Sequence, residues 1–285
     1  MIAKFFRIWI AMKAMKPILL SPLNACALRL CLFIPGLVLA FSTSAVHAQS
    51  VDVPTIAAAA DLKFAVEEIA AAFSAGGKRA VKLTFGSSGN FYMQISQSAP
   101  FQMFMSADEA LVFQLAEKGR TVDRGALYAT GRLVLFAPHG SPLTVDPQMA
   151  GLKAALAAGS IQRFAIANPE HAPYGRAAEQ ALASVGLWEA IRPRLVLGEN
   201  VSQAAQFAIS GSTQGGMFAY SLSFAPEIVK AGNHILVPEN LHQPLRQRMV
   251  LLKGAGETAR AFYTYLQQPA ARSVLKRYGF VLPGE

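Results

Sequence analysis

The chain has 285 residues, with 26 Lys and Arg against 17 Asp and Glu, and a formal net charge of +9. Five of the basic residues and none of the acidic ones lie in residues 1–48, so the remaining chain carries a net charge of about +4. This mild excess is spread along the chain rather than clustered, which excludes a nucleic-acid-binding protein and suits an anionic ligand.

The first 48 residues have the pattern of a cleavable secretory signal peptide. Basic residues come first, an apolar run follows from Leu30 to Phe41, and a Val-His-Ala cleavage pattern ends at Ala48. We therefore expect export to the periplasm and cleavage after Ala48. A retained membrane anchor is disfavoured, because it needs roughly 20 continuous apolar residues and Arg29 and Pro35 interrupt this stretch.

Short β-prone runs alternate with Ala-rich amphipathic segments along the rest of the chain. The predicted strands are 55–60, 81–85, 101–105, 133–137, 163–167, 195–197, 216–220, 234–237 and 246–252. The predicted helices are 62–73, 91–98, 109–118, 177–185, 202–210, 258–267 and 269–278. Strands followed by helices at this spacing are typical of βαβ units with a parallel sheet, so the predicted fold class is α/β.

The domain organisation is predicted from the absence of a linker. Two domains joined by a single tether would show a polar, Pro/Gly/Ser-rich break near the middle, and the sequence has none. A chain that crosses twice between two lobes inside continuous strands leaves no such break. We therefore predict one lobe from residues 49–134 with 243–285, and a second lobe from residues 135–242.

Signatures of enzymes and of metal sites are weak. Both cysteines, Cys26 and Cys31, precede the expected cleavage site, and no histidine has a metal-ligand spacing. The run Gly86-Ser87-Ser88-Gly89 lacks the Gly-x-Ser-x-Gly pattern of a nucleophile elbow, because neither serine has a glycine two places away on both sides. We expect no catalytic residues and no cofactor; an exported hydrolase that uses Ser88 is the alternative from another class.

Four strand-to-helix turns, at residues 59–62, 86–90, 173–175 and 199–202, consist mostly of small and polar residues. A helix N-terminus presents free backbone N–H groups and a partial positive charge, so it binds anions without Lys or Arg. In an open α/β sheet such turns lie at the carboxyl ends of strands, where ligands bind. Each turn alone is explained by helix capping, with Asp61, Ser88 and Asn90 as ordinary N-caps. Two such turns in each predicted lobe would form a trap for an oxyanion.

Several segments of the chain form a recognisable set: 57–62 (AAAADL), 85–89 (FGSSG), 99–109, 168–175 (NPEHAPYG), 198–201 (GENV) and 278–282 (YGFVL). In order and spacing, these segments resemble the periplasmic molybdate-binding proteins. The resemblance covers nearly all of residues 51–283. It implies a two-lobed periplasmic binding protein fold of the type II kind, in which each lobe is a mostly parallel sheet flanked by helices and the ligand cleft lies between the lobes.

The function implied by this resemblance is the capture of molybdate, with tungstate or another tetrahedral oxyanion such as sulfate as alternatives. Delivery to a membrane permease with a cytoplasmic ATPase is implied as well, and we take the protein to be a monomer. Molybdenum would enter only as the oxyanion, without direct protein–metal ligands. The implied contacts are the Ser88 hydroxyl and N–H, the N–H groups of Tyr174 and Val201, the turn at Ala60 and Asp61, and a position near Ala219.

Two of these positions depart from the pattern of the relatives. Asp61 stands where relatives commonly carry Ser, Thr or Asn, and a carboxylate beside a dianion would be repelled. We predict that the carboxylate turns away to cap its own helix while its N–H or that of Ala60 faces the ligand, so that Asp61→Asn changes affinity little. Ala219 stands where some relatives place a ligand-contacting tyrosine, and Tyr220 would point elsewhere in a regular strand.

Overall fold

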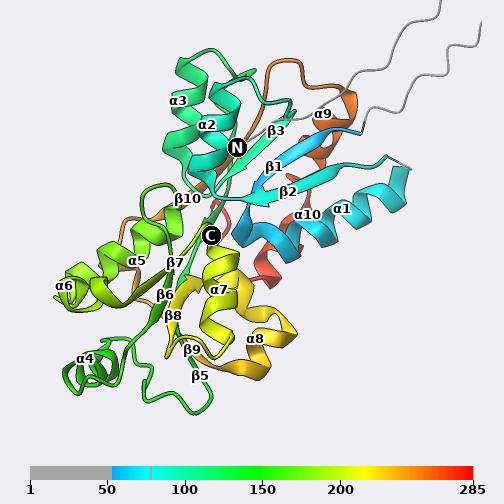
Figure 1. Cartoon of the computed structure of the whole chain (residues 1–285). Coiled ribbons are helices and arrows are strands. Elements are labelled where there is room, and N and C mark those ends of the chain that lie inside the picture. The colour runs from blue at the N-terminus through cyan, green and yellow to red at the C-terminus, as the bar shows by residue number, and fades with distance from the viewer. Residues whose placement is uncertain (1–52, 78, 285) are drawn as a thin grey trace, which may run out of the picture. The chain divides into compact units, whose positions relative to one another are not determined.

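The computed structural model describes residues 53–77 and 79–284, so the expected signal peptide and its cleavage site lie outside the described residues. In this part of the chain, strands form two five-stranded sheets (Figure 1). The first, in the order β2-β1-β3-β10-β4, consists of β1 (Thr55–Ala59), β2 (Lys82–Gly86), β3 (Met103–Ser106), β4 (Ala126–Gly131) and β10 (Leu245–Leu251). The second, in the order β7-β6-β8-β5-β9, consists of β5 (Leu133–Pro138), β6 (Phe164–Ala167), β7 (Leu195–Gly198), β8 (Gly216–Ala219) and β9 (Gly232–Leu236).

The two sheets share one topology, with four strands in one direction and one strand reversed. In the first sheet β1 is parallel to β2 and β3, whereas β10 is antiparallel to β3 and β4. In the second sheet β6 is parallel to β7 and β8, whereas β5 is antiparallel to β8 and β9. Each reversed strand is the one that follows a passage of the chain from the other sheet. The prediction of an α/β fold with mostly parallel sheets is confirmed.

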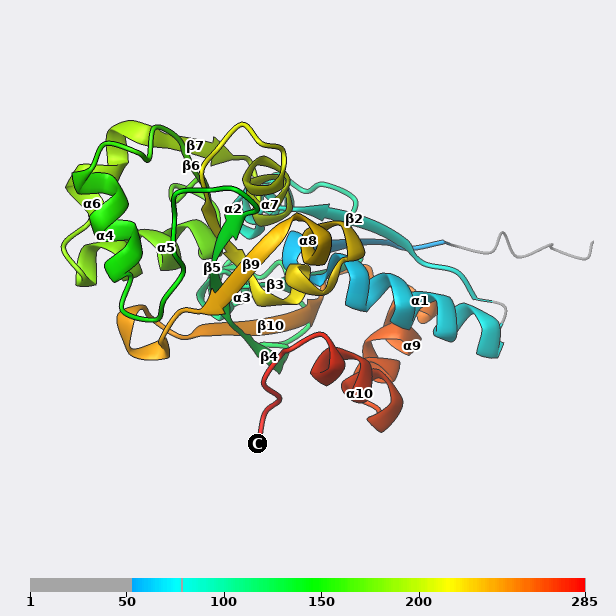
Figure 2. The ribbon, with the colours of Figure 1, turned by 90° about the horizontal axis from the view of Figure 1, so that it is seen from below.

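Helices cover both faces of the first sheet (Figures 1 and 2). One face carries α2 (Ser88–Ser96) and α3 (Glu109–Glu117), and the other carries α1 (Lys63–Gly77), α9 (Glu257–Tyr265) and α10 (Pro269–Arg277). Successive side chains of a strand point to opposite faces. Accordingly, Ala57 packs with Phe91 and Val112, whereas Ile56 and Ala58 belong to the larger core cluster that includes α1.

The second sheet is flanked by α4 (Ala150–Ala157), α5 (Pro173–Ser184), α6 (Trp188–Ile191), α7 (Val201–Ile209) and α8 (Pro226–Ala231). All residues of β6 and β8 are buried, as in strands covered on both faces. The sequence-based elements did not include β4, α4, α6 or α8, which the structure adds. None of the described helices is long and apolar enough to cross a bilayer.

Candidate ligand-binding site

A cavity lies where turns at the carboxyl ends of strands from both sheets meet. It is lined by Ala59, Ala60 and Asp61 after β1, Gly86, Ser87 and Ser88 after β2, Ala107 after β3, Ala172, Pro173 and Tyr174 after β6, and Val201 after β7. The space measures about 190 Å³, its opening to solvent included. Four of the predicted site residues, Asp61, Ser88, Tyr174 and Val201, are therefore brought together, and no Lys or Arg lines the cavity.

Ala219 is not among these lining residues. It is the last residue of β8, it pairs with Leu133 of β5, and it is fully buried. The neighbouring Tyr220 packs on Phe224 and His234 rather than lining the cavity.

Three helices begin at the wall of the cavity. The first residues of α2, α5 and α7 are Ser88, Pro173 and Val201. The side chain of Asn200 caps α7 by accepting the N–H groups of the two residues that follow Val201. The N–H groups of Ser88, Tyr174 and Val201 have no hydrogen-bond acceptor among the described residues. Unpaired first-turn N–H groups and the positive ends of helix dipoles together favour an anion in this space.

The turns of the two sheets are fastened together beside the cavity. The N–H of Gly89 and the hydroxyl of Ser87 both donate to the carbonyl oxygen of His171, at 2.9 and 2.5 Å. A Cβ atom at Gly89 would lie 2.4 Å from that oxygen, so only glycine allows this approach. The Asn90 amide also donates to a carboxylate oxygen of Glu199.

Hydroxyl groups of the second half of the chain also hold the turn after β1, which forms the 3-10 helix η1 (Ala60–Leu62). Ser202 Oγ donates to the carbonyl oxygen of Ala60 at 2.8 Å, and Ser221 Oγ donates to that of Asp61 at 2.7 Å. From the sequence, Ser202 was placed in the turn 199–202 without a role for its hydroxyl, and Ser221 was not identified. The position of η1 therefore depends on groups about 140 to 160 residues away.

The Asp61 side chain is 1% exposed. No side-chain hydrogen bond caps η1, so the expected capping role of Asp61 is not what the structure shows. Instead, Asp61 Oδ2 accepts hydrogen bonds from Gln247 Nε2 at 2.6 Å and Tyr174 Oη at 3.0 Å. Tyr128 Oη completes the network by donating to Gln247 Oε1 at 2.7 Å. Asp61 Oδ1 is buried without a hydrogen-bond partner.

The pKa of Asp61 is raised from 3.8 to about 6. Burial is the largest cause, because it removes the carboxylate from water. The hydrogen bonds from Gln247 and Tyr174, and the nearby N–H of Asp61 itself, lower the pKa without offsetting burial. With this pKa, the Asp61 carboxyl group on the cavity wall gains or loses its proton close to neutral pH.

One residue of this network, Gln247, is indicated by the sequence pattern of its strand. Gln247 is fully buried in β10, where the residues two places on either side, Leu245 and Met249, are buried apolar side chains. A polar residue at an inward position of an alternating strand indicates a buried partner. Gly131 is required by Tyr174, because a Cβ atom there would lie 2.1 Å from Tyr174 Oη.

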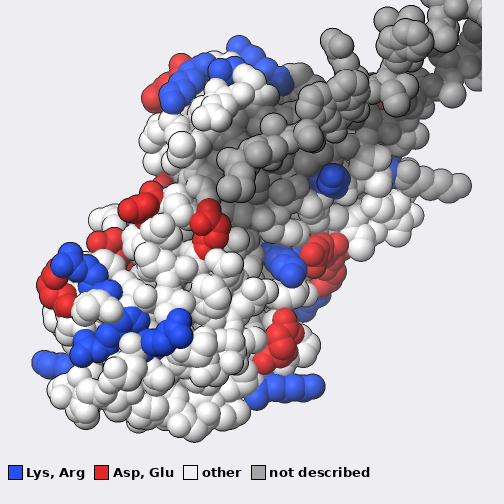
Figure 3. Space-filling model, in the orientation of Figure 1, with Lys and Arg blue, Asp and Glu red and all other residues white. Residues whose placement is uncertain are grey.

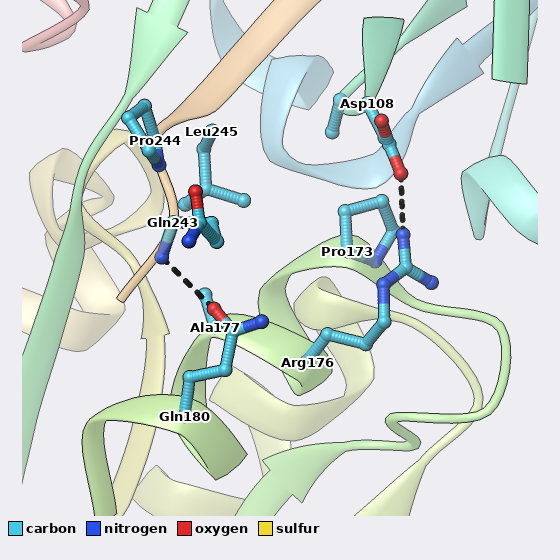
Figure 4. A pocket seen from close by; sticks show the side chains of 9 residues that line it. Asp108, Pro173, Arg176, Ala177, Gln180, Gln243, Pro244 and Leu245 are labelled. Carbon is cyan, nitrogen blue, oxygen red and sulfur yellow. Dashed lines mark hydrogen bonds and ion pairs between the residues drawn. The ribbon is translucent and has the colours of Figure 1, made fainter. Parts of the chain in front are cut away.

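The cation that follows Tyr174 in sequence does not line this cavity. Arg176 borders a neighbouring cavity, where its guanidinium donates to Asp108 Oδ2 at 2.6 Å (Figure 4). In that cavity the N–H of Gln243 also donates to Gln180 Oε1 at 2.9 Å. The carboxylate of Asp108 therefore balances the arginine. Over the face seen in Figure 3, basic and acidic side chains are interspersed without a continuous basic stripe.

Comparison with known proteins decides the family. Residues 54–281 match the bacterial extracellular solute-binding protein family. The chain belongs to this family. This solute-binding protein is 37% identical over 228 residues to the molybdate-binding protein of Rhodobacter capsulatus, covering 79% of this chain and 86% of the relative. It is 38% identical over 230 residues to that of Azotobacter vinelandii, covering 80% and 89%.

A solved structure of a molybdate-binding protein also resembles this protein. The Azotobacter vinelandii periplasmic molybdate-binding protein matches this solute-binding protein with a TM-score of 0.73 at 31% sequence identity, covering 81% of this chain and all of that one. The resemblance expected from the sequence is confirmed.

The alternative of a hydrolase that uses Ser88 gains no support from the geometry of this solute-binding protein. Ser88 Oγ accepts the N–H of Ala107 at 3.0 Å, and no histidine or carboxylate of the described residues hydrogen-bonds to it. His171 Nδ1 lies 3.0 Å from Ser87 Oγ instead, and that hydroxyl donates to the His171 carbonyl. Among the described residues, no three His, Cys, Asp or Glu side chains gather as they would around a metal ion.

Proposed function

We propose that this protein captures molybdate, or the closely similar tungstate, in the periplasm and delivers it to a membrane permease with a cytoplasmic ATPase, without catalysing a reaction. The observation that carries the proposal is the cavity at the N-termini of α2, α5 and α7, which no Lys or Arg lines. The names of the relatives from Rhodobacter capsulatus and Azotobacter vinelandii supply the ligand.

Neutral donors suit an oxyanion whose oxygen atoms all accept hydrogen bonds. The unpaired N–H groups of Ser88, Tyr174 and Val201 belong to three separate turns that line the cavity, and an apolar residue such as Val201 can serve an anion only through its main chain. The Ser88 hydroxyl already accepts the N–H of Ala107, so its own proton is available to the ligand. Hydrogen bonds to an ionised group are about twice as strong as neutral ones, which compensates for the absence of a cation.

We further propose a two-lobed organisation and a periplasmic location for the protein. Residues 49–134 with 243–285 form one lobe and 135–242 the other, and the bonds of Ser87 and Gly89 to His171 hold the lobes closed over the anion. A signal peptide cut after Ala48 directs the protein to the periplasm, where it acts as a monomer. The distribution of strands between the two sheets supports this division to within two residues, since β5 of the second sheet begins at Leu133.

Calorimetric titration of the processed protein with molybdate, tungstate, sulfate and phosphate tests the proposal. We expect one molybdate or tungstate per chain, bound well below millimolar concentration. Ser88→Ala should weaken binding roughly 10- to 100-fold, because a hydrogen bond to a charged group contributes about 1.5–3 kcal/mol. Ser273→Ala is the matched control, since its hydroxyl donates to Pro269 in exposed α10. If none of the four anions binds below the millimolar range, the proposal is wrong.

A further inference from the structure

The carboxyl group of Asp61 would repel an anion in this cavity if it were ionised. Asp61 lines the cavity, and its Oδ2 already accepts two hydrogen bonds. Three buried side-chain polar atoms in the described residues lack a partner, namely Asp61 Oδ1, Ser96 Oγ and His242 Nε2. Asp61 is the only one of these residues that lines the cavity. A buried polar atom of this kind needs a partner, and here the ligand is the one available.

We propose that Asp61 takes up one proton from solvent when the oxyanion binds, and that the protonated Oδ1 then donates a hydrogen bond to an oxygen of the anion. A protonated carboxyl group is a hydrogen-bond donor, whereas an ionised one is only an acceptor. This inference rests on the proposed function, because it concerns the same cavity and the same ligand. It makes Asp61 the residue that selects oxyanions whose oxygen atoms are all acceptors.

The surroundings of Asp61 favour the protonated form. Burial raises its pKa to about 6 before any anion is present, and a dianion in the cavity would raise it further by repulsion. The titratable groups that interact with it are the phenols of Tyr174 from α5 and Tyr128 from β4. Burial, followed by the charge of Asp61, raises the pKa of both phenols well above 10, so both remain neutral.

The other elements packed against η1 bring no cation to the carboxyl group. Lys63 at the start of α1 lies over the ring of Phe64, and Glu199 before α7 interacts with Asn90 and His171. None of these side chains contributes to the pKa shift of Asp61. No cation of the described residues therefore holds Asp61 in the ionised form when a dianion enters, and the hydrogen bonds from Gln247 and Tyr174, which favour that form, do not offset burial.

Selectivity follows from the direction of this hydrogen bond. Molybdate and tungstate are fully deprotonated near neutral pH and offer only acceptors to the Asp61 proton. Hydrogen phosphate carries a proton on one of its oxygens. This O–H group would face the N–H and O–H donors of the cavity, so that two donors would oppose each other and no hydrogen bond would form. An ionised Asp61 would reverse the preference, because it would accept the proton of hydrogen phosphate.

The test is calorimetric titration of the processed protein with molybdate at several pH values from 6 to 8, in buffers of different ionisation enthalpy. The buffer dependence of the heat gives the number of protons taken up. We expect an uptake of about half a proton at pH 6 that approaches one proton at pH 7.5, and a Kd that rises about tenfold per pH unit above pH 7.

The variant Asp61→Asn locates the proton. Its amide oxygen can accept the bonds of Gln247 and Tyr174 while its NH₂ group donates to the anion, as the protonated acid would. We expect no proton uptake, an affinity independent of pH, and binding about tenfold tighter than wild type at pH 7, which revises the small effect expected from the sequence. Asp146→Asn is the matched control, because it makes the same substitution at a carboxylate that does not line the cavity and that accepts the N–H groups of Gln148, Ala150 and Gly151; uptake should persist in it.

Three results would overturn the inference and leave the proposed function standing: molybdate binding by wild type without proton uptake, uptake that persists in Asp61→Asn, or loss of uptake in the control Asp146→Asn. If wild type binds no oxyanion at all, the proposed function fails and the inference fails with it. The wild-type measurement decides the matter even if Asp61→Asn does not fold.

Discussion

Replacing Asp61 by Asn should stabilise the ligand-free protein at neutral pH. Burial raises the pKa of Asp61 from 3.8 to about 6, so between these values the folded state binds more protons than the unfolded chain. Stability therefore falls as pH rises through this window. The shift corresponds to a cost of about 3 kcal/mol above pH 7, at about 1.4 kcal/mol per pKa unit. Asparagine keeps the size and the acceptor of the side chain but does not ionise.

Urea unfolding at several pH values from 4 to 8 measures this effect. We expect Asp61→Asn to be more stable than wild type by about 3 kcal/mol at pH 7.5, and the two stabilities to converge near pH 4. The control is Asp146→Asn. Burial pushes the pKa of Asp146 up, but the N–H groups of Gly151, Ala150 and Gln148 outweigh it and lower the pKa, so this variant should be destabilised at neutral pH. Equal or lower stability of Asp61→Asn at pH 7.5 would refute the reasoning.

Three further substitutions test the contacts around the cavity. Gly131→Ala places a Cβ atom 2.1 Å from Tyr174 Oη, so urea unfolding should show a loss of about 1–3 kcal/mol; an unchanged midpoint would contradict the close packing. Asn200→Ala removes the cap of α7 and should lower stability by about 1 kcal/mol, which thermal unfolding detects, whereas no shift would mean that the cap is dispensable. Ser202→Ala removes the hydrogen bond to the Ala60 carbonyl and should weaken molybdate binding severalfold in calorimetry; unchanged affinity would show that this contact does not position η1.

Much of the fold follows from local patterns in the sequence. The β-prone runs and amphipathic segments correspond closely to β1, α1 and β2, because side-chain period and helix-ending residues are properties of neighbouring positions. Local patterns failed where the signal was weak. In β4, half-buried and buried positions do not alternate regularly. The helix α4 follows Met149 in a left-handed conformation, and Asp146 accepts the N–H groups of its first residues from outside the helix.

The turns that line the cavity were also visible in the sequence. Small and hydroxyl-bearing residues directly after strands indicate helix N-termini, and parallel strands bring such turns to one edge of a sheet. This pattern predicted an anion site at these turns, and the resemblance to the molybdate-binding proteins implied the backbone N–H groups of Ser88, Tyr174 and Val201 as its contacts. The physical reason is that an N–H donor at a helix start depends on the helix and hardly at all on distant contacts.

Only the tertiary structure decided what Asp61 does. Its partners are Tyr174 and Gln247, which lie 113 and 186 residues away in sequence. Its pKa depends on complete burial, and burial results from the packing of elements far apart in sequence, among them α1, α7 and β2, around η1. The sequence determines that residue 61 has a carboxyl group. The free energy of ionising that group depends on its removal from water and on the hydrogen-bond donors around it. Those are properties of the folded chain, and they convert an expected cap into a proton-accepting side chain on the cavity wall.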